Sequence, residues 1–313
     1  MSSSHTNGPR VHGDMPPSSS SAASLSNSSA TGLPPLSLSI LGVEPLDEFI
    51  KEVADFVHHM IVTRPEHLGG VVEVEAKIGL IVDRAAGGRL KLPVLVETVL
   101  DPNAPLDIRF ESNMSSTQHR HYNTLLNSLK TDQPTASPLD YSHLYLLDNF
   151  FPAPSDPASD SGRGGDKVRV TRDEKTSQVV QCVKKIRLGD LNVWSPHHKA
   201  DWRVSVNLEV PVQHPLGSPS YTRRKDRMRY THEEFVIDLT QVTTHSAPNA
   251  PPQQILHELE LEIARPELLL ATAAKRNDVT VSEHERSAFD ELIRAFVNNA
   301  RILVKNSMTE GGW

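Results

Sequence analysis

The sequence of 313 residues predicts an α+β fold in which a large antiparallel β-sheet is flanked by helices. Six strand-like runs follow one another between Lys167 and Ile263, and no helical pattern interrupts them. Strands that are joined without an intervening helix pair antiparallel, and a long series of them predicts a closed barrel or a sandwich. Amphipathic helical patterns stand before and after this region, which completes the α+β prediction.

Three helices are predicted. In Pro45–Thr63 apolar residues recur at helical spacing, and Asp47 and Glu48 suit a helix start. A second helix is expected over Thr117–Leu129, with its large apolar residues on one face. The last helix, Ser282–Val304, begins with a capping-box pattern.

The first strand is predicted over Val71–Val82, and the turn residues Asp83–Gly88 would let Arg89–Val94 return as a hairpin. The six later strands are predicted over Lys167–Arg172, Val179–Leu188, Trp202–Val210, Tyr221–Thr231, Phe235–Val242 and Ile255–Ile263. The segments between them are predicted as a mobile loop over Pro152–Asp166 and as polar links over Gly189–Ala200 and Thr243–Gln253.

Composition sets the domain limits. The first 40 residues include 13 serines and five prolines, so residues 1–43 are expected to be a disordered tail. One domain is expected over residues 44–306, and a short tail over residues 307–313. The single cysteine, Cys182, excludes internal disulfides and cysteine-based zinc sites. No secretory signal or stretch of 18 apolar residues is found, so no membrane segment is expected.

Two segments set glutamates on alternate residues between aliphatic ones. Because strand side chains alternate between two faces, each segment has one acidic face. The acidic faces carry Glu73, Glu75 and Lys77 in Val71–Gly79, and Glu258, Glu260 and Glu262 in His257–Ile263. If these faces meet, the carboxylates repel one another unless a hard cation or basic groups neutralise them. Ligation by glutamate oxygens suits Mg²⁺ or Mn²⁺ better than zinc.

Other predicted strands supply the opposite charge. The cationic faces carry Arg223, Lys225, Arg227 and Arg229 on one strand, Arg169 on a second, and Lys185 with Arg187 on a third. Glu209, Asp238 and Thr240 lie on polar faces of further strands. If all these faces point into a closed barrel, water is scarce there and each charge needs a partner. Such a tunnel would bind a polyphosphate through its bases and a divalent ion through its acids.

Two plainer interpretations compete with this one. An antiparallel sheet commonly has one solvated face, which would account for each strand taken alone. The basic run Thr222–Arg229 would also serve as a nuclear address or a nucleic-acid patch, although its strict alternation fits a strand better. The sequence contains no P-loop and no GxSxG motif, so P-loop NTPases and serine hydrolases have no support.

Three motifs in order carry a family resemblance: VEVEAKIG at Val72–Gly79, RRKDRMRY at Arg223–Tyr230 and HELELE at His257–Glu262. With them the chain resembles the fungal RNA 5′-triphosphatases, which are the β subunits of fungal mRNA-capping enzymes and belong to the triphosphate tunnel metalloenzyme superfamily. The resemblance covers roughly Pro45 to Val304. It implies an eight-stranded antiparallel β-barrel, flanked by helices, whose interior is the triphosphate tunnel.

The resemblance also implies an activity and its setting. Family members remove the γ-phosphate from the 5′ end of nascent pre-mRNA, the first step of capping, with Mg²⁺ or Mn²⁺, and hydrolyse free nucleoside triphosphates when given manganese. The implied partners are the guanylyltransferase, the phosphorylated tail of RNA polymerase II, or both. A homodimer in the nucleus is the further expectation.

Residue roles follow by position in the motifs. The resemblance implies Glu73, Glu75 and Glu262 as metal ligands, and Arg169, Lys185, Arg223, Lys225 and Arg227 as phosphate-binding residues, with Arg223 also bracing the acidic walls. It implies that Glu209 orients the attacking water and that Asp238 assists it. Lys77, Thr240, Glu258 and Glu260 are expected to support these groups.

Two rival functions remain open at this stage. An inorganic tripolyphosphatase, a thiamine triphosphatase or a class IV adenylate cyclase would share the ExExK motif, here Glu73, Glu75 and Lys77. A non-catalytic barrel that binds a phosphorylated partner would keep the bases but have no use for the glutamates.

Overall fold

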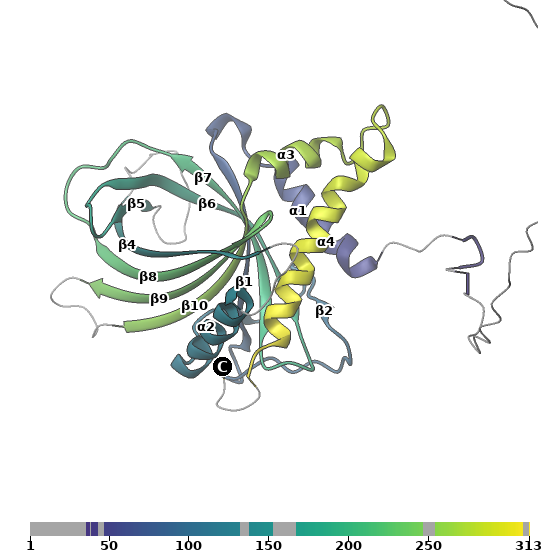
Figure 1. Ribbon diagram of the computed structural model, residues 1–313, viewed down its shortest axis with the longest axis horizontal. Helices are drawn as coiled ribbons and strands as arrows, with labels where there is room; N and C mark the ends of the chain where they lie inside the picture. The colour runs from purple at the N-terminus through teal and green to yellow at the C-terminus, as the bar shows by residue number, and fades with distance from the viewer. Residues whose placement is uncertain are drawn as a thin grey trace, which may run out of the picture. The chain divides into compact units, whose positions relative to one another are not determined.

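Within the unit Leu46–Trp313, the strands form an antiparallel barrel and helices pack against its outside (Figure 1). The computed structural model describes residues 36–37, 39–42, 47–131, 138–152, 167–246, 254–308 and 313. The helices are α1 (Glu48–Val62), the 3₁₀ helix η1 (Glu66–Leu68), α2 (Ser116–Thr131), α3 (Pro266–Lys275) and α4 (Glu283–Lys305). The strands are β1 (Val71–Asp83), β2 (Thr98–Val99), β3 (Ile108–Glu111), β4 (Asp140–Pro152), β5 (Lys167–Asp173), β6 (Val179–Trp194), β7 (Asp201–Pro211), β8 (Tyr221–His232), β9 (Phe235–Ser246) and β10 (Gln254–Ile263).

The barrel closes because β1 and β10 pair with each other. Around the ring the described strands follow the order β10-β9-β8-β4-β5-β6-β7-β1, with antiparallel neighbours, and β1 returns to β10. In the closing pair Glu75 lies opposite Glu262, and Lys77 lies opposite Glu260. β3 pairs with β1 and β2 pairs with β6 outside this ring. The predicted α+β fold with an eight-stranded antiparallel barrel is therefore confirmed.

The main hydrophobic core lies outside the barrel, between its wall and the helices. Val74 and Ile78 of β1 are fully buried there with Val57 of α1 and with Phe289 and Phe296 of α4. Because neighbouring residues of a strand point to opposite faces, this outward burial leaves the alternate residues of β1 to face the barrel interior. The helices thus cover the apolar face of the strands, and the interior is left to polar side chains.

A smaller core closes around one end of β1. Ile81, Leu90, Leu100 and Trp194 are buried together, with Phe110 of β3 packed against them. β3 approaches β1 closely at Gly79, where an added Cβ would stand 2.2 Å from the backbone oxygen of Glu111. A side chain at position 79 would therefore push β3 away from β1.

The buried carboxylate of Asp201 anchors the segment that follows β1. It accepts hydrogen bonds from the backbone N–H groups of Ile81 and Ser195 at 3.0 Å, and from Nε of Arg89 at 3.0 Å. The predicted hairpin at Arg89–Val94 is wrong. Arg89 forms only an isolated bridge to Val82, because β3 supplies the strand that pairs with this end of β1.

Most other predicted elements are confirmed, with three kinds of correction. The predicted helices over Pro45–Thr63, Thr117–Leu129 and Ser282–Val304 correspond to α1, α2 and α4, and Ser282 and Glu285 form the capping box. The predicted link over Gly189–Ala200 is wrong in its first half, because β6 continues to Trp194, and β9 likewise continues to Ser246. Strands β2, β3 and β4 and helix α3 were not predicted.

Several predictions fall outside the described residues. The tail over residues 1–43 is described only at residues 36–37 and 39–42, and the loop after Pro152 is not described until Lys167. The domain limits at residues 43 and 307 therefore stay predictions. Among the helices of the described ranges, none combines the length and apolarity needed to span a membrane.

A histidine pair between α2 and β10 predicts a pH dependence of stability. The rings of His119 and His257 lie 4.7 Å apart, and Nε2 of His119 is buried with no hydrogen-bond partner among the described residues. Burial and the neighbouring His257 lower the pKa of His119 to about 4. Since the unfolded chain has the ordinary pKa near 6.5, it binds more protons between those values, and stability falls as the pH drops from about 6.5 to 4.

Replacing the imidazole of His119 should remove its contribution to the pH dependence of stability. In His119→Gln we expect the melting temperature to fall less between pH 6.5 and 4 than in the wild type, as measured by circular dichroism. His67→Gln, at an exposed position in η1, is the control and should keep the wild-type slope. Identical slopes in His119→Gln and the wild type would contradict the account.

Candidate active site

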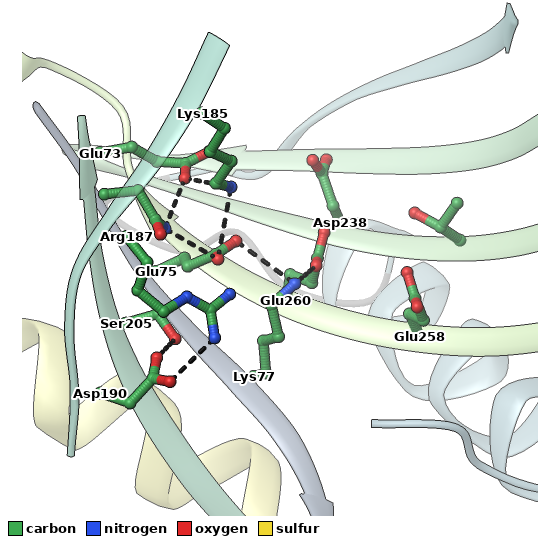
Figure 2. A network of polar contacts seen from close by, with 12 residues as sticks. Glu73, Glu75, Lys77, Lys185, Arg187, Asp190, Ser205, Asp238, Glu258 and Glu260 are labelled. Atoms are coloured by element: carbon green, nitrogen blue, oxygen red, sulfur yellow. Dashed lines mark hydrogen bonds and ion pairs between the residues drawn. The ribbon is translucent and has the colours of Figure 1, made fainter. Parts of the chain in front are cut away.

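Charged side chains from all eight barrel strands line the barrel interior, and Figure 2 shows part of their network. The carboxylates in the central part are Glu73, Glu75, Asp148, Glu209, Asp238, Glu258, Glu260 and Glu262, and the cations are Lys77, Arg169, Lys185, Arg223, Lys225, Arg227 and Arg229. Each of these cations lies within ion-pair distance of at least one of these carboxylates. The structure therefore brings all the residues predicted for the site onto one inner surface.

Two neighbouring glutamates of β1 share one lysine. The ammonium of Lys185 forms an ion pair with Oε2 of Glu73 and lies 3.5 Å from Oε1 of Glu75 (Figure 2). Asn207 of β7 donates to the same two oxygens at 3.0 and 3.2 Å. Burial and the nearby Glu75 raise the pKa of Glu73. Lys77 also lies 3.4 Å from Oε2 of Glu75, so two lysines and an amide hold these two crowded carboxylates.

Glu262 adds to this crowding. It is the register partner of Glu75 on the neighbouring strand, and its carboxylate has no hydrogen bond or ion pair with the described part of the chain. Burial, together with the negative charges of Glu73 and Asp238, raises the pKa of Glu262 to about 8. A nearby cation would stabilise the charged form of a carboxylate with such a raised pKa.

The three glutamates fit a hard divalent cation in donor type. All three offer carboxylate oxygens from two paired strands, which is the donor set that Mg²⁺ and Mn²⁺ prefer. As the side chains stand, no three His, Cys, Asp or Glu groups of the described residues are gathered to hold an ion. Lys185 contacts two of the glutamates, so binding an ion requires these side chains to rearrange.

A second chain of ion pairs runs from β1 across β10 to β8 and β9. Lys77 pairs with Glu260, which also lies 3.3 Å from Arg227. Arg227 donates to Asp238 at 2.6 Å, and Arg229 donates to both oxygens of Asp238 at 2.8 and 2.7 Å. Although burial opposes its charge, Lys77 and Arg227 hold the pKa of Glu260 well below its usual range.

Strands β4 to β8 hold two more ion pairs of the interior. Arg169 of β5 donates to Oε1 of Glu209 at 2.8 Å, and Gln181 donates to the other oxygen of Glu209 at 2.6 Å. Lys225 lies 2.6 Å from Asp148, which also accepts from Thr171 at 2.6 Å. Burial and the nearby Arg227 and Arg169 lower the pKa of Lys225, and Asp148 opposes this shift. Both carboxylates therefore hold a cation toward the interior.

The remaining predicted residues lie along the same surface. Arg223 donates to Glu258 at 3.2 Å, which places it against the acidic wall of β10. Thr240 accepts a hydrogen bond from Nε of Arg227 at 3.0 Å. Their contacts are those of residues that orient neighbouring charges.

Sequence reasoning missed five polar residues of the interior: Asp148, Gln181, Asp190, Ser205 and Asn207. Gln181 and Asn207 lie at even spacing from Lys185 and Glu209 on their strands, so the alternation could have found them. Asp148 lies on β4, which was not predicted. Asp190 accepts from Ser205 at 2.6 Å, and it shares a face with Lys185 only because a bulge after Arg187 shifts the register of β6.

Comparison with known proteins places this barrel in a family. A family model described as "mRNA capping enzyme, beta chain" matches residues 43–309. The chain belongs to the mRNA-capping enzyme beta-chain family. The mRNA-capping enzyme subunit beta of Schizosaccharomyces pombe is 34% identical over 279 residues, which cover 88% of this chain and 86% of that protein. The subunit beta of Cryptococcus neoformans is also 34% identical, over 88% of this chain and 66% of that longer protein.

Solved structures agree with the family assignment. The structure of the S. pombe Pct1 RNA triphosphatase matches the structure described here with a TM-score of 0.76 and 32% sequence identity. The match covers 88% of this chain and 100% of the Pct1 chain. A second structure, of Pct1 in complex with the Spt5 CTD, matches with a TM-score of 0.75.

Breaking one interior pair tests how the charges depend on each other. Glu260→Gln removes a carboxylate that is only 13% exposed and that pairs with both Lys77 and Arg227, so we expect the free energy of unfolding in urea to fall by about 3 kcal/mol. Glu234→Gln breaks the exposed pair with Arg265 and should cost less than about 1 kcal/mol. Equal losses in the two variants would contradict the interior pairing.

Proposed function

We propose that this protein is an RNA 5′-triphosphatase that removes the γ-phosphate from the 5′ end of nascent pre-mRNA, the first step of mRNA capping. The observation that carries the proposal is the closed barrel whose interior sets Glu73, Glu75 and Glu262 beside a wall of arginines and lysines. The family to which the chain belongs, and the RNA triphosphatase activity named for Pct1, support it.

The cations bind and position the triphosphate. Arg169, Lys185, Lys225 and Arg227 converge on the interior from three strands, and each is held by a carboxylate partner. The transition state of phosphoryl transfer spreads negative charge over the equatorial oxygens, so fixed cations stabilise it without reorganising. Burial among these charges excludes much of the water that would weaken them.

Glu209 orients the attacking water and accepts its proton. Arg169 of β5 donates to one carboxylate oxygen of Glu209 and Gln181 of β6 donates to the other, so the orientation of this side chain is fixed. The water oxygen forms a bond to the γ-phosphorus while the bond from that phosphorus to the β–γ bridging oxygen breaks. The products are inorganic phosphate and an RNA with a diphosphate end, and no covalent enzyme intermediate is needed.

Glu73, Glu75 and Glu262 would hold the divalent cation, Mg²⁺ or Mn²⁺. When bound, the cation neutralises charge on the phosphate oxygens, which complements the lysines and arginines. The raised pKa of Glu262 fits this role, because a bound cation would stabilise the charged form of its carboxylate. Hydrolysis of free nucleoside triphosphates with manganese belongs to the same proposal.

The partners follow from the reaction and from the relatives. The product has the end that a guanylyltransferase uses, so we propose this enzyme as a partner, in the nucleus. The complex of Pct1 with the Spt5 CTD supports recruitment through a tail of the transcription machinery, and the phosphorylated tail of RNA polymerase II is our second candidate. We also propose a homodimer.

A phosphate-release assay on γ-labelled triphosphate RNA with magnesium tests the function. The wild type should release only the terminal phosphate, and Glu75→Ala should reduce turnover by at least about a hundredfold, since it removes a carboxylate from the proposed cation site. Glu174→Ala, which removes a carboxylate paired with Arg224 outside the barrel, is the matched control and should keep full turnover.

Two outcomes would point elsewhere. Turnover of inorganic tripolyphosphate with none of RNA would indicate another tunnel-fold triphosphatase. A phosphate-binding barrel would be indicated by two results together: the wild type shows no turnover, and Glu75→Ala binds anions as tightly as the wild type or more tightly.

A further inference from the structure

An aromatic pair stands on the inner face of the barrel, and the proposed reaction does not use it. Phe150 of β4 and Tyr221 of β8 are register partners, and their rings stack with centroids 4.5 Å apart and planes 9° apart. The ammonium of Lys167, the first residue of β5, lies 4.9 Å from the centroid of the Tyr221 ring. Both rings are half-buried and Lys167 is exposed. The group therefore differs from the sealed core outside the barrel.

Strand register places this group next to the phosphate-binding residues. Phe150 is the register partner of Arg169, and Tyr221 is two residues from Arg223 on β8. Residues two apart on a strand share a face and lie about 7 Å apart along it. Lys167 stands in the same relation to Arg169. The aromatic pair and Lys167 are thus the next interior positions beyond Asp148, Arg169 and Arg223 on three neighbouring strands.

These positions also lie at or near the ends of their strands. β5 begins at Lys167, β8 begins at Tyr221, and β4 ends two residues after Phe150. The three strands lie side by side in the barrel wall (Figure 1). A triphosphate held between Arg169 and Lys225 therefore has aromatic rings and a lysine next to it at the rim.

We propose that Phe150, Tyr221 and Lys167 form a subsite for the 5′-terminal nucleoside of the RNA, with its base stacked on the aromatic pair and Lys167 attracting the phosphodiester that follows. The inference rests on the proposed function and adds to it how the enzyme recognises the nucleic acid. Stacking on aromatic side chains tolerates any base, because every base has a π-face. The subsite thus favours substrates that carry a nucleoside over bare inorganic tripolyphosphate.

The test compares three substrates in Phe150→Leu, which keeps an apolar side chain but removes the ring. We expect KM to rise about tenfold for triphosphate RNA and for ATP, with kcat little changed, because one base–aromatic stack is lost. KM for inorganic tripolyphosphate should stay the same, which also shows that the variant is folded. Phe150→Tyr should restore the wild-type values.

A matched control lies on the outer face of the same strand. Tyr145 has the ammonium of Lys175 at 4.7 Å from its ring centroid, so it repeats the lysine-over-tyrosine arrangement outside the barrel. Tyr145→Leu should change none of the three KM values. If tripolyphosphate is bound without turnover, its inhibition constant against RNA hydrolysis takes the place of its KM.

The outcomes separate this inference from the proposed function. Equal changes for all three substrates in Phe150→Leu, or no change for RNA and ATP, would overturn the subsite while leaving the triphosphatase intact. A wild type that leaves RNA untouched would overturn the proposed function, and the ratio of ATP to tripolyphosphate affinity would still test the stacking.

Discussion

The architecture depends on the outward burial of the apolar faces of the barrel strands. Val74 and Ile78 of β1 pack under α1 and α4 rather than into the barrel centre. Without this helical cover the apolar faces would have to turn inward, and the barrel would be filled as small barrels usually are. With the cover in place, the apolar core lies outside the barrel, and the interior holds charged side chains whose burial is offset by their ion pairs.

The interior charges are kept in place by register. A slip of one residue between β1 and β10 would turn the glutamates of one strand into the helical core and the leucines into the tunnel, so the apolar pattern itself fixes which carboxylates meet. Glu75 then faces Glu262, and Lys77 faces Glu260. The Lys77–Glu260 pair joins opposite charges, as in a structural ion pair, whereas Glu75 and Glu262 are two carboxylates, as in the cation site that we propose.

The functional conclusion depends on the site more than on the barrel, because one fold can host many chemistries. Segregated charge on the inner face indicates a polyphosphate ligand and a hard cation, which several tunnel enzymes share. Family membership narrows the choice to the capping branch. The aromatic pair at Phe150 and Tyr221 adds a feature that bare phosphate does not require. Chemistry and recognition thus occupy successive positions along the same strands.

The sequence by itself determined the inner faces of β1, β8 and β10, because strict alternation of charge and aliphatic residues has the period of a strand. It did not determine the partners of those charges. Asp148, which holds Lys225, lies on β4, whose two faces are both partly exposed and so carry no alternation to detect. Tertiary structure also determines the conformation around Arg89, because β3 pairs with the end of β1 and the guanidinium of Arg89 donates a hydrogen bond to the buried Asp201. The local sequence pattern determines which face of a strand a side chain lies on. Which residues it contacts there depends on packing between segments that are far apart in the sequence.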